Sequence, residues 1–218
     1  PVSFIHHSIR DSSLSKVATG DRSKKYSPSK NTDMKVIITE TTAVASAIAR
    51  ALNVNNKVSA PGVFYDAKTA VITVPKDFIA PYGVGVLPGK DALPIVPERY
   101  SYGLRVTRGE PGRNGISAED QAYADYIGDL IRGGREVVFA SDGGADAQGR
   151  FSNICRFFKV GAPTSRMWVT RLEKKALKRA YETRVRGRAM YNLAQSGLVA
   201  MAMNEAFKYN VTEAYRAM

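Results

Sequence analysis

The sequence is poor in the residues that define several classes of protein. Its 218 residues include a single cysteine, Cys155, which excludes an intramolecular disulfide and a cysteine-based zinc site and favours a reducing compartment. Long apolar runs are also missing, since none approaches the ~20 residues of a bilayer-spanning helix. We therefore expect no membrane partner and a location in the cytoplasm or nucleoid, with an organelle matrix as the alternative.

Acidic residues are scarce relative to basic ones. The formal net charge is +12, and residues 150–188 alone contain 12 Lys or Arg and only two Glu. Because the excess is concentrated in one stretch, it favours a polyanion as partner. A solvated basic helix face is the alternative interpretation. The candidate polyanion-binding residues are Arg150, Arg156, Arg171, Lys174, Lys175, Lys178 and Arg179.

Composition divides the chain into three parts. Residues 1–33 contain eight Ser and no Glu, which predicts an extended basic arm. From Met34 to residue 170, strand-like and helical patterns alternate, which predicts an α/β domain with a sheet flanked by helices. Residues 171–218 predict a helical segment. In it, Thr170 and Glu173 suggest a capping box before a lysine-rich helix, and a last helix from near Arg188 has a nearly uncharged centre, which predicts packing.

Two strand-turn-helix units carry the candidate site. Residues 34–40 (MKVIITE) predict a buried strand that ends at Glu40, and residues 136–140 predict another that leads into a glycine-rich turn with Asp142 and Asp146. If these strands are parallel neighbours, Glu40 and Asp142 converge at their carboxyl ends. Carboxylate oxygens there suit Mg²⁺. An ordinary surface turn, in which Asp caps the next helix, is the alternative.

Shorter signals connect these units. Residues 63–65 and 70–74 predict an antiparallel hairpin with Asp66 in its turn. Ser117 predicts the start of an amphipathic helix that ends at Gly133 and Gly134. This helix would connect the hairpin to the second strand of the candidate site.

Four segments occur in an order that resembles a known family. They are MKVIITETTAVASAIARALN, LPIVPERY, VVFASDGGADAQGRFSNICRFF and RMWVTRLEKKALKRAYE. Together, over about residues 34–209, they resemble the amino-terminal part of type IA DNA topoisomerases of the topoisomerase III kind. The resemblance implies a TOPRIM domain with a Rossmann-like sheet, isomerase activity and DNA as the partner, with RNA or a larger nucleoprotein assembly as alternatives. It also implies that Glu40 does acid/base work and that Asp142 and Asp146 hold Mg²⁺, weakly.

The departures from the family motif limit the expected activity. The family's acidic turn reads Asp-x-Asp-x-Glu-Gly-Glu, whereas this chain keeps Asp142, has Asp146 in place of the Glu, and replaces the second and last acids by Gly144 and Gln148. The nucleophilic tyrosine belongs to a later family domain, so no tyrosine of these 218 residues is assigned that role. We therefore expect strand cleavage by this chain alone to be impaired or absent. The alternative is a catalytically inactive TOPRIM-derived subunit with a structural or nucleic-acid-binding role in a larger assembly.

Overall fold

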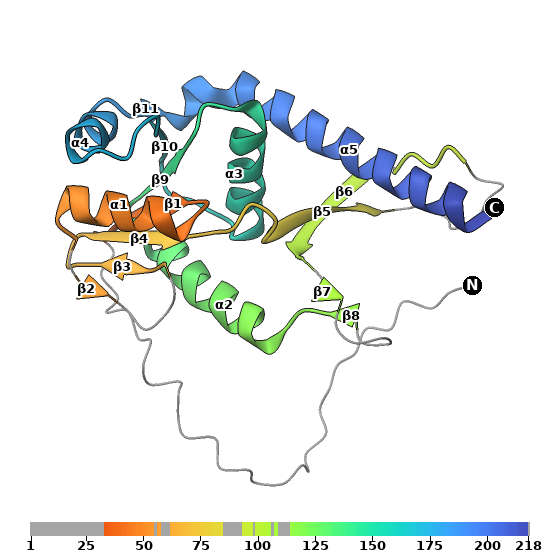
Figure 1. Cartoon of the computed structure of the whole chain (residues 1–218), viewed down its shortest axis with the longest axis horizontal. Helices are drawn as coiled ribbons and strands as arrows, with labels where there is room; N and C mark the ends of the chain where they lie inside the picture. The colour runs from red at the N-terminus through yellow and green to blue at the C-terminus, as the bar shows by residue number, and fades with distance from the viewer. Residues whose placement is uncertain are drawn as a thin grey trace, which may run out of the picture.

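The computed structural model describes residues 33–54, 56–57, 62–84, 93–97, 99–105, 107–108 and 114–217. The predicted arm lies outside these residues, except for Asp33. The described part forms a mixed sheet with helices on both faces, which confirms the predicted α/β class (Figure 1).

Seven strands form the main sheet, in the order β11-β10-β9-β1-β4-β3-β2. The four central strands are parallel: β1 (Lys35–Thr39), β4 (Thr69–Thr73), β9 (Glu136–Ser141) and β10 (Thr164–Trp168). Three short antiparallel strands extend the edges: β2 (Asn56–Lys57), β3 (Phe64–Tyr65) and β11 (Val185–Arg186). In the centre, Val36, Ile37 and Ile38 are fully buried, as expected for a β-branched parallel strand covered on both faces.

The helices divide between the two faces of the sheet. Helices α1 (Thr42–Leu52) and α4 (Lys174–Glu182) pack on the face that Ile37 and Val138 present. Helices α2 (Ala118–Gly133) and α3 (Ala145–Phe157) cover the other face, where the Phe139 and Phe151 rings stack with centroids 4.8 Å apart. Adjacent residues of a strand therefore pack into the cores on opposite faces of the sheet, because side chains alternate along a strand.

Local capping and turn signals behave as predicted. Ser117 Oγ accepts a hydrogen bond from the Asp120 amide at the start of α2, and the helix ends at Gly133. Asp66 Oδ1 accepts from the Lys68 and Thr69 amides in the turn between β3 and β4. These bonds satisfy backbone groups at helix and strand ends, so short-range sequence was sufficient to predict them.

The predicted capping box at Thr170 is wrong. The Val169 amide still donates to the Ser141 carbonyl at 2.9 Å, so the chain reaches Thr170 while leaving the sheet, and α4 begins only at Lys174. Its N-cap residue, Glu173, makes no side-chain capping bond. Beyond α4, β11 pairs with β10, so the segment after residue 170 adds a strand to the sheet.

The remaining elements lie beside this body. Strands β5 (Ile79–Val84) and β6 (Arg99–Leu104) form a separate ribbon, and β7 (Thr107–Arg108) pairs with β8 (Asn114–Gly115). A 3₁₀ turn, η3 (Gly187–Met190), leads into α5 (Tyr191–Ala217), so the last helix begins three residues later than predicted. Figure 1 shows α5 running alongside the β5–β6 ribbon, where the Tyr100 hydroxyl donates to the Ala202 carbonyl at 2.8 Å.

The prediction that the centre of α5 is packed is only partly right. Ala194 is buried, but Val199, Met203 and Phe207 are exposed at a spacing of four residues. Such a spacing follows one ridge of a helix, which here faces away from the ribbon and the sheet. Among the described helices, none combines the length and apolar character that crossing a bilayer would require.

Candidate functional site

The site lies between the carboxyl ends of β1 and β9. The helices that follow these strands leave on opposite faces, α1 on one and α3 on the other. Thr39 pairs in register with Ala140, so Glu40 and Asp142, just beyond the strand ends, reach the same edge of the sheet. Parallel sheets bind ligands at such switch points. The predicted convergence of Glu40 and Asp142 is therefore confirmed.

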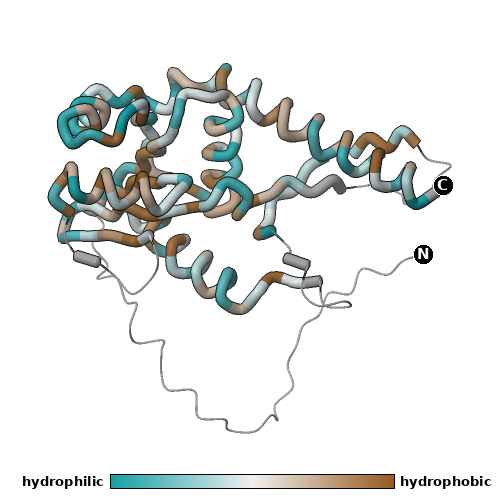
Figure 2. The backbone as a smooth tube through the Cα atoms, viewed as in Figure 1, coloured by the Kyte–Doolittle hydropathy of each residue, from teal (hydrophilic) through white to brown (hydrophobic). Residues whose placement is uncertain are grey.

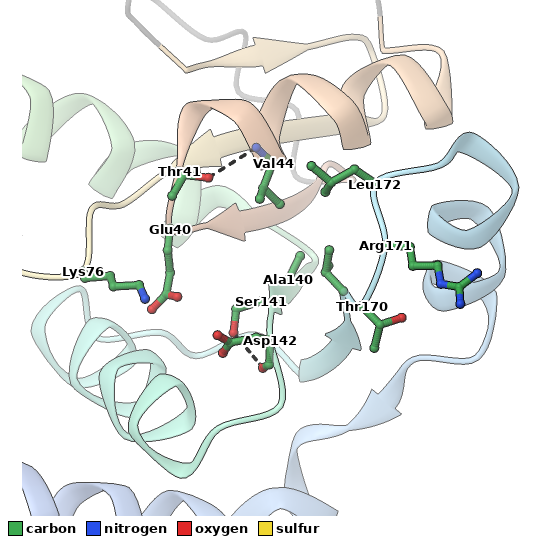
Figure 3. Close-up of a pocket in the computed structure, with 11 residues that line it drawn as sticks. Glu40, Thr41, Val44, Lys76, Ala140, Ser141, Asp142, Thr170, Arg171 and Leu172 are labelled. Atoms are coloured by element: carbon green, nitrogen blue, oxygen red, sulfur yellow. Dashed lines mark hydrogen bonds between the residues drawn. The ribbon is translucent and has the colours of Figure 1, made fainter.

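A cavity of about 250 Å³ opens at this edge. It is bordered by residues that follow all four parallel strands: Glu40 after β1, Lys76 after β4, Asp142 after β9 and Arg171 after β10. Figure 3 shows Lys76 and Glu40 extending toward one another, whereas the Arg171 guanidinium extends away from the carboxylates. The cavity thus places both signs of charge at one sheet edge.

Glu40 is already paired with a cation of the chain. Arg150 Nε, on α3, donates to Glu40 Oε1 at 2.6 Å, and the two side chains are only 18% and 8% exposed. Shielding from solvent weakens screening, so this charge-assisted hydrogen bond is stronger than a surface ion pair. Arg150 is one of the predicted polyanion-binding residues, and in the structure its guanidinium is paired with this carboxylate.

A buried arginine lies beneath the cavity floor. Arg166, in the middle of β10, is 1% exposed and sits against the rings of Phe139 and Trp168, with centroids 4.6 and 5.0 Å from its guanidinium carbon. Its Nη2 donates to Ser141 Oγ at 2.8 Å and to the Asp142 carbonyl oxygen. Burial lowers the pKa of Arg166 to about 10, while the negative charges of Glu40 and Asp142 oppose that fall. Arg166 therefore keeps its positive charge at neutral pH.

The two aspartates predicted to bind Mg²⁺ face different cavities. Asp146 is exposed in the first turn of α3 and borders a neighbouring cavity together with Arg150 and Lys208, whereas Asp142 borders the cavity with Glu40. Among the described residues, no three Asp, Glu, His or Cys side chains are grouped closely enough to hold a metal ion. The predicted metal role of Asp142 and Asp146 stays a prediction.

The replacement at Gln148 has a structural role here. Gln148 is 4% exposed, and its Oε1 accepts from Arg166 Nη1 at 3.1 Å. The neutral amide therefore helps satisfy the buried guanidinium under the cavity. Gly144, the other replacement, is the N-cap residue of α3 and has no side chain to offer a ligand.

No known family model matches this chain, and no curated protein sequence matches it either. The likeness to the TOPRIM region of topoisomerases therefore stays a prediction that rests on the motif residues. What the geometry adds is the position of Glu40 and Asp142 at a common sheet edge.

Apart from Arg150, the predicted polyanion-binding residues lie on opposite faces of the sheet. One group is exposed on α4 and just before it, and consists of Arg171, Lys174, Lys175, Lys178 and Arg179. Within the described residues, none of these five forms an ion pair with a carboxylate at 4.0 Å or less. Figure 2 colours most of α4 as hydrophilic. Arg156, on α3, lies over the Tyr102 ring on the opposite face of the sheet. Only the α4 group forms a continuous basic surface.

Two site residues were missed by the sequence reasoning. Lys76 follows the predicted hairpin strand at residues 70–74, so recognising that strand as parallel to β1 would have placed Lys76 at the same edge. Arg166 carried a signal too, since a lone charge inside an apolar strand is costly unless it is paired. Its side-chain partners, Gln148 and Ser141, lie 18 and 25 residues away in the sequence, so no local pattern identifies them.

Proposed function

We propose that this chain is a TOPRIM-like, DNA-binding region of a type IA topoisomerase-like protein, in which strand cleavage by this chain alone is impaired or absent. The observation that carries the proposal is the cavity at the β1–β9 switch point. Glu40 and Asp142 border this cavity, and the chain segment that passes it after β10 leads into the basic helix α4. A phosphate backbone bound along α4 would pass this cavity, because Arg171 borders the cavity and lies three residues before the start of α4.

Helix α4 supplies the electrostatic part of the proposal. Leu177 anchors the helix in the core beside α1, which leaves Lys174, Lys175 and Lys178 free to face solvent. Exposed lysines that contact phosphates release condensed counterions, so DNA affinity falls steeply as salt rises. We expect this surface to provide general affinity for the backbone rather than recognition of base sequence.

Impaired cleavage is expected because some acids of the family motif are replaced and Glu40 is already paired. Two of the four acids of the family motif are absent, at Gly144 and Gln148, and Glu40 is held by Arg150. Phosphoryl transfer depends on placed charge, and the loss of one stabilising donor typically costs about 10²–10³ in rate. Supercoil relaxation by the 218-residue chain with Mg²⁺ is therefore expected to be undetectable, and measurable relaxation would contradict this part of the proposal.

The binding part is tested by the salt dependence of DNA affinity. Replacing Lys174, Lys175 and Lys178 together by Gln should reduce the slope of log affinity against log salt by about 2.7 for duplex DNA. Fluorescence anisotropy with a labelled duplex measures this slope. The matched control replaces the exposed Arg132, Lys159 and Arg216 by Gln, which removes equal charge elsewhere. Equal slopes for both triple variants would reject α4 as the DNA-binding surface.

One observation favours the alternative of a subunit in a larger assembly. Besides Val199, Met203 and Phe207, α5 exposes the apolar side chains of Val211 and Tyr215 further along the helix. Several exposed apolar side chains on one element are typical of a surface that contacts another protein. If assembly is the main role, replacing Met203 and Phe207 by Lys should abolish association in sedimentation velocity and leave DNA affinity unchanged.

A further inference from the structure

The Glu40 carboxylate has its positive partner built into the chain. Arg150 Nε donates to it at 2.6 Å inside a shielded pair, and Arg150 also borders the neighbouring cavity that contains Asp146. A divalent cation at Glu40 would have to displace this guanidinium or share the carboxylate with it. Like charges repel strongly at such short range in a partly buried site, so both arrangements are unfavourable.

The other carboxylates near this cavity do not replace Glu40 as a ligand for a divalent cation. Mg²⁺ is usually held by one or two carboxylates together with water and substrate phosphate. Here Asp142 is the only other carboxylate bordering the Glu40 cavity among the described residues, and Asp146 borders a different one. With Glu40 paired to Arg150 and the acids at positions 144 and 148 replaced, Asp142 alone remains unpaired at this cavity within the described part of the chain, so the residues present do not fit the Mg²⁺ site that the topoisomerase resemblance implies.

The charges around the cavity favour an anion over a divalent cation. Lys76 borders it beside Glu40, Arg150 pairs with Glu40, and Arg166 lies directly beneath, bonded to Ser141 and to the Asp142 carbonyl. Three cations thus face two carboxylates. A crevice with a net positive charge attracts anions and disfavours divalent cations.

We propose that Arg150 is a built-in counter-ion that stands beside Glu40 where a divalent cation would otherwise be needed, and that the crevice holds a nucleic-acid phosphate through Lys76 without Mg²⁺. This inference rests on the proposed DNA-binding function, and it adds that the binding of DNA at this crevice requires no metal ion. An ammonium group is sufficient for such a contact, because lysine binds phosphate as a point charge.

The test compares binding of a labelled single-stranded oligonucleotide in EDTA and in Mg²⁺ at equal ionic strength, using the full chain. Wild-type affinity should agree within about twofold between the two conditions. Lys76→Gln should weaken binding roughly fivefold at 0.1 M salt, and Glu40→Gln should strengthen it by a similar factor, because it frees the Arg150 guanidinium. Strict dependence on Mg²⁺, or weaker binding by Glu40→Gln, would overturn the proposal.

A calorimetric titration with Mg²⁺ alone tests the counter-ion separately. Wild-type protein should show no binding at low millimolar Mg²⁺, whereas Arg150→Gln removes the cation that pairs with Glu40 and should gain a site. Arg184→Gln is the matched control, since it breaks a similar Arg–Glu pair at the other end of β9. Circular dichroism melting verifies that each variant folds.

The outcomes separate the two proposals. Binding of Mg²⁺ by the wild type, or no gain of a site in Arg150→Gln that melts like the wild type, would overturn the counter-ion role. Absence of oligonucleotide binding by the wild type in both conditions would instead overturn the proposed DNA-binding function and the phosphate contact, and the Mg²⁺ titration would still decide the role of Arg150.

Discussion

Substituting Gly197 by Ala tests the close crossing of α3 and α5. Gly197 on α5 faces Gly149 on α3, and a Cβ atom at Gly197 would lie 2.0 Å from the Ala145 carbonyl oxygen and 2.9 Å from the Gly149 nitrogen. Both neighbours are backbone atoms, which cannot rotate away as a side chain would. To restore an ordinary contact, α5 would have to move by roughly 1 Å, and close-packed interiors resist such shifts.

Two effects of opposite sign decide the magnitude. Ala in place of Gly in a helix contributes up to about 1 kcal/mol through propensity. Overpacking typically costs 1–3 kcal/mol, and a clash between two backbones belongs at or above the upper end of that range. We expect a net loss of about 2 kcal/mol in the free energy of unfolding, which corresponds to a fall in Tm of roughly 4–8 °C for a protein of this size.

The assay is urea and thermal unfolding followed by circular dichroism. Gly133→Ala is the control, because Gly133 is the last residue of α2 and a Cβ atom there would meet nothing within 4 Å. This control should raise stability by up to about 1 kcal/mol, since only propensity acts. If Gly197→Ala raised stability as much as Gly133→Ala does, the reasoning about the close crossing would be refuted.

Two further predictions concern titrating groups. The hydrogen bonds from Arg184 hold the pKa of Glu136 below its ordinary value of 4.5, so the pair stabilises the fold at neutral pH and its contribution disappears as the pH falls through the lowered pKa. Glu136→Gln should lower the free energy of unfolding by about 1–2 kcal/mol at pH 7, and urea titrations should find that difference vanishing in acid; a difference independent of pH would contradict the ion pair. Burial raises the pKa of Cys155 to about 12, so its thiolate fraction at pH 8 is roughly a thousandfold smaller than that of a free cysteine. Iodoacetamide should therefore label the folded protein very slowly and the urea-unfolded protein readily, and equal rates would show that Cys155 is accessible.

Much of the fold could be predicted because its signals are local. The strand before Glu40, the strand before Asp142 and the helix capped by Ser117 all form where periodicity and capping residues indicate, since each depends on neighbours within about one turn. The failed capping box at Thr170 is informative for the same reason. Its residue types are suitable, but a sheet hydrogen bond from the preceding Val169 keeps the backbone extended there.

By itself, the sequence determined which residues stand at strand ends, and with them the candidate acids Glu40 and Asp142, because a run of β-branched residues that breaks into polar ones is a short-range pattern. The tertiary structure alone decided which charged residues lie near these acids. It pairs Arg150 with Glu40, brings Lys76 to the same edge of the sheet, and places Asp146 at a separate cavity. Strand order and the rotation of α3 about its own axis set these neighbours, and both depend on packing between segments far apart in the chain. The charge of the site therefore follows from non-local contacts, which no short motif encodes.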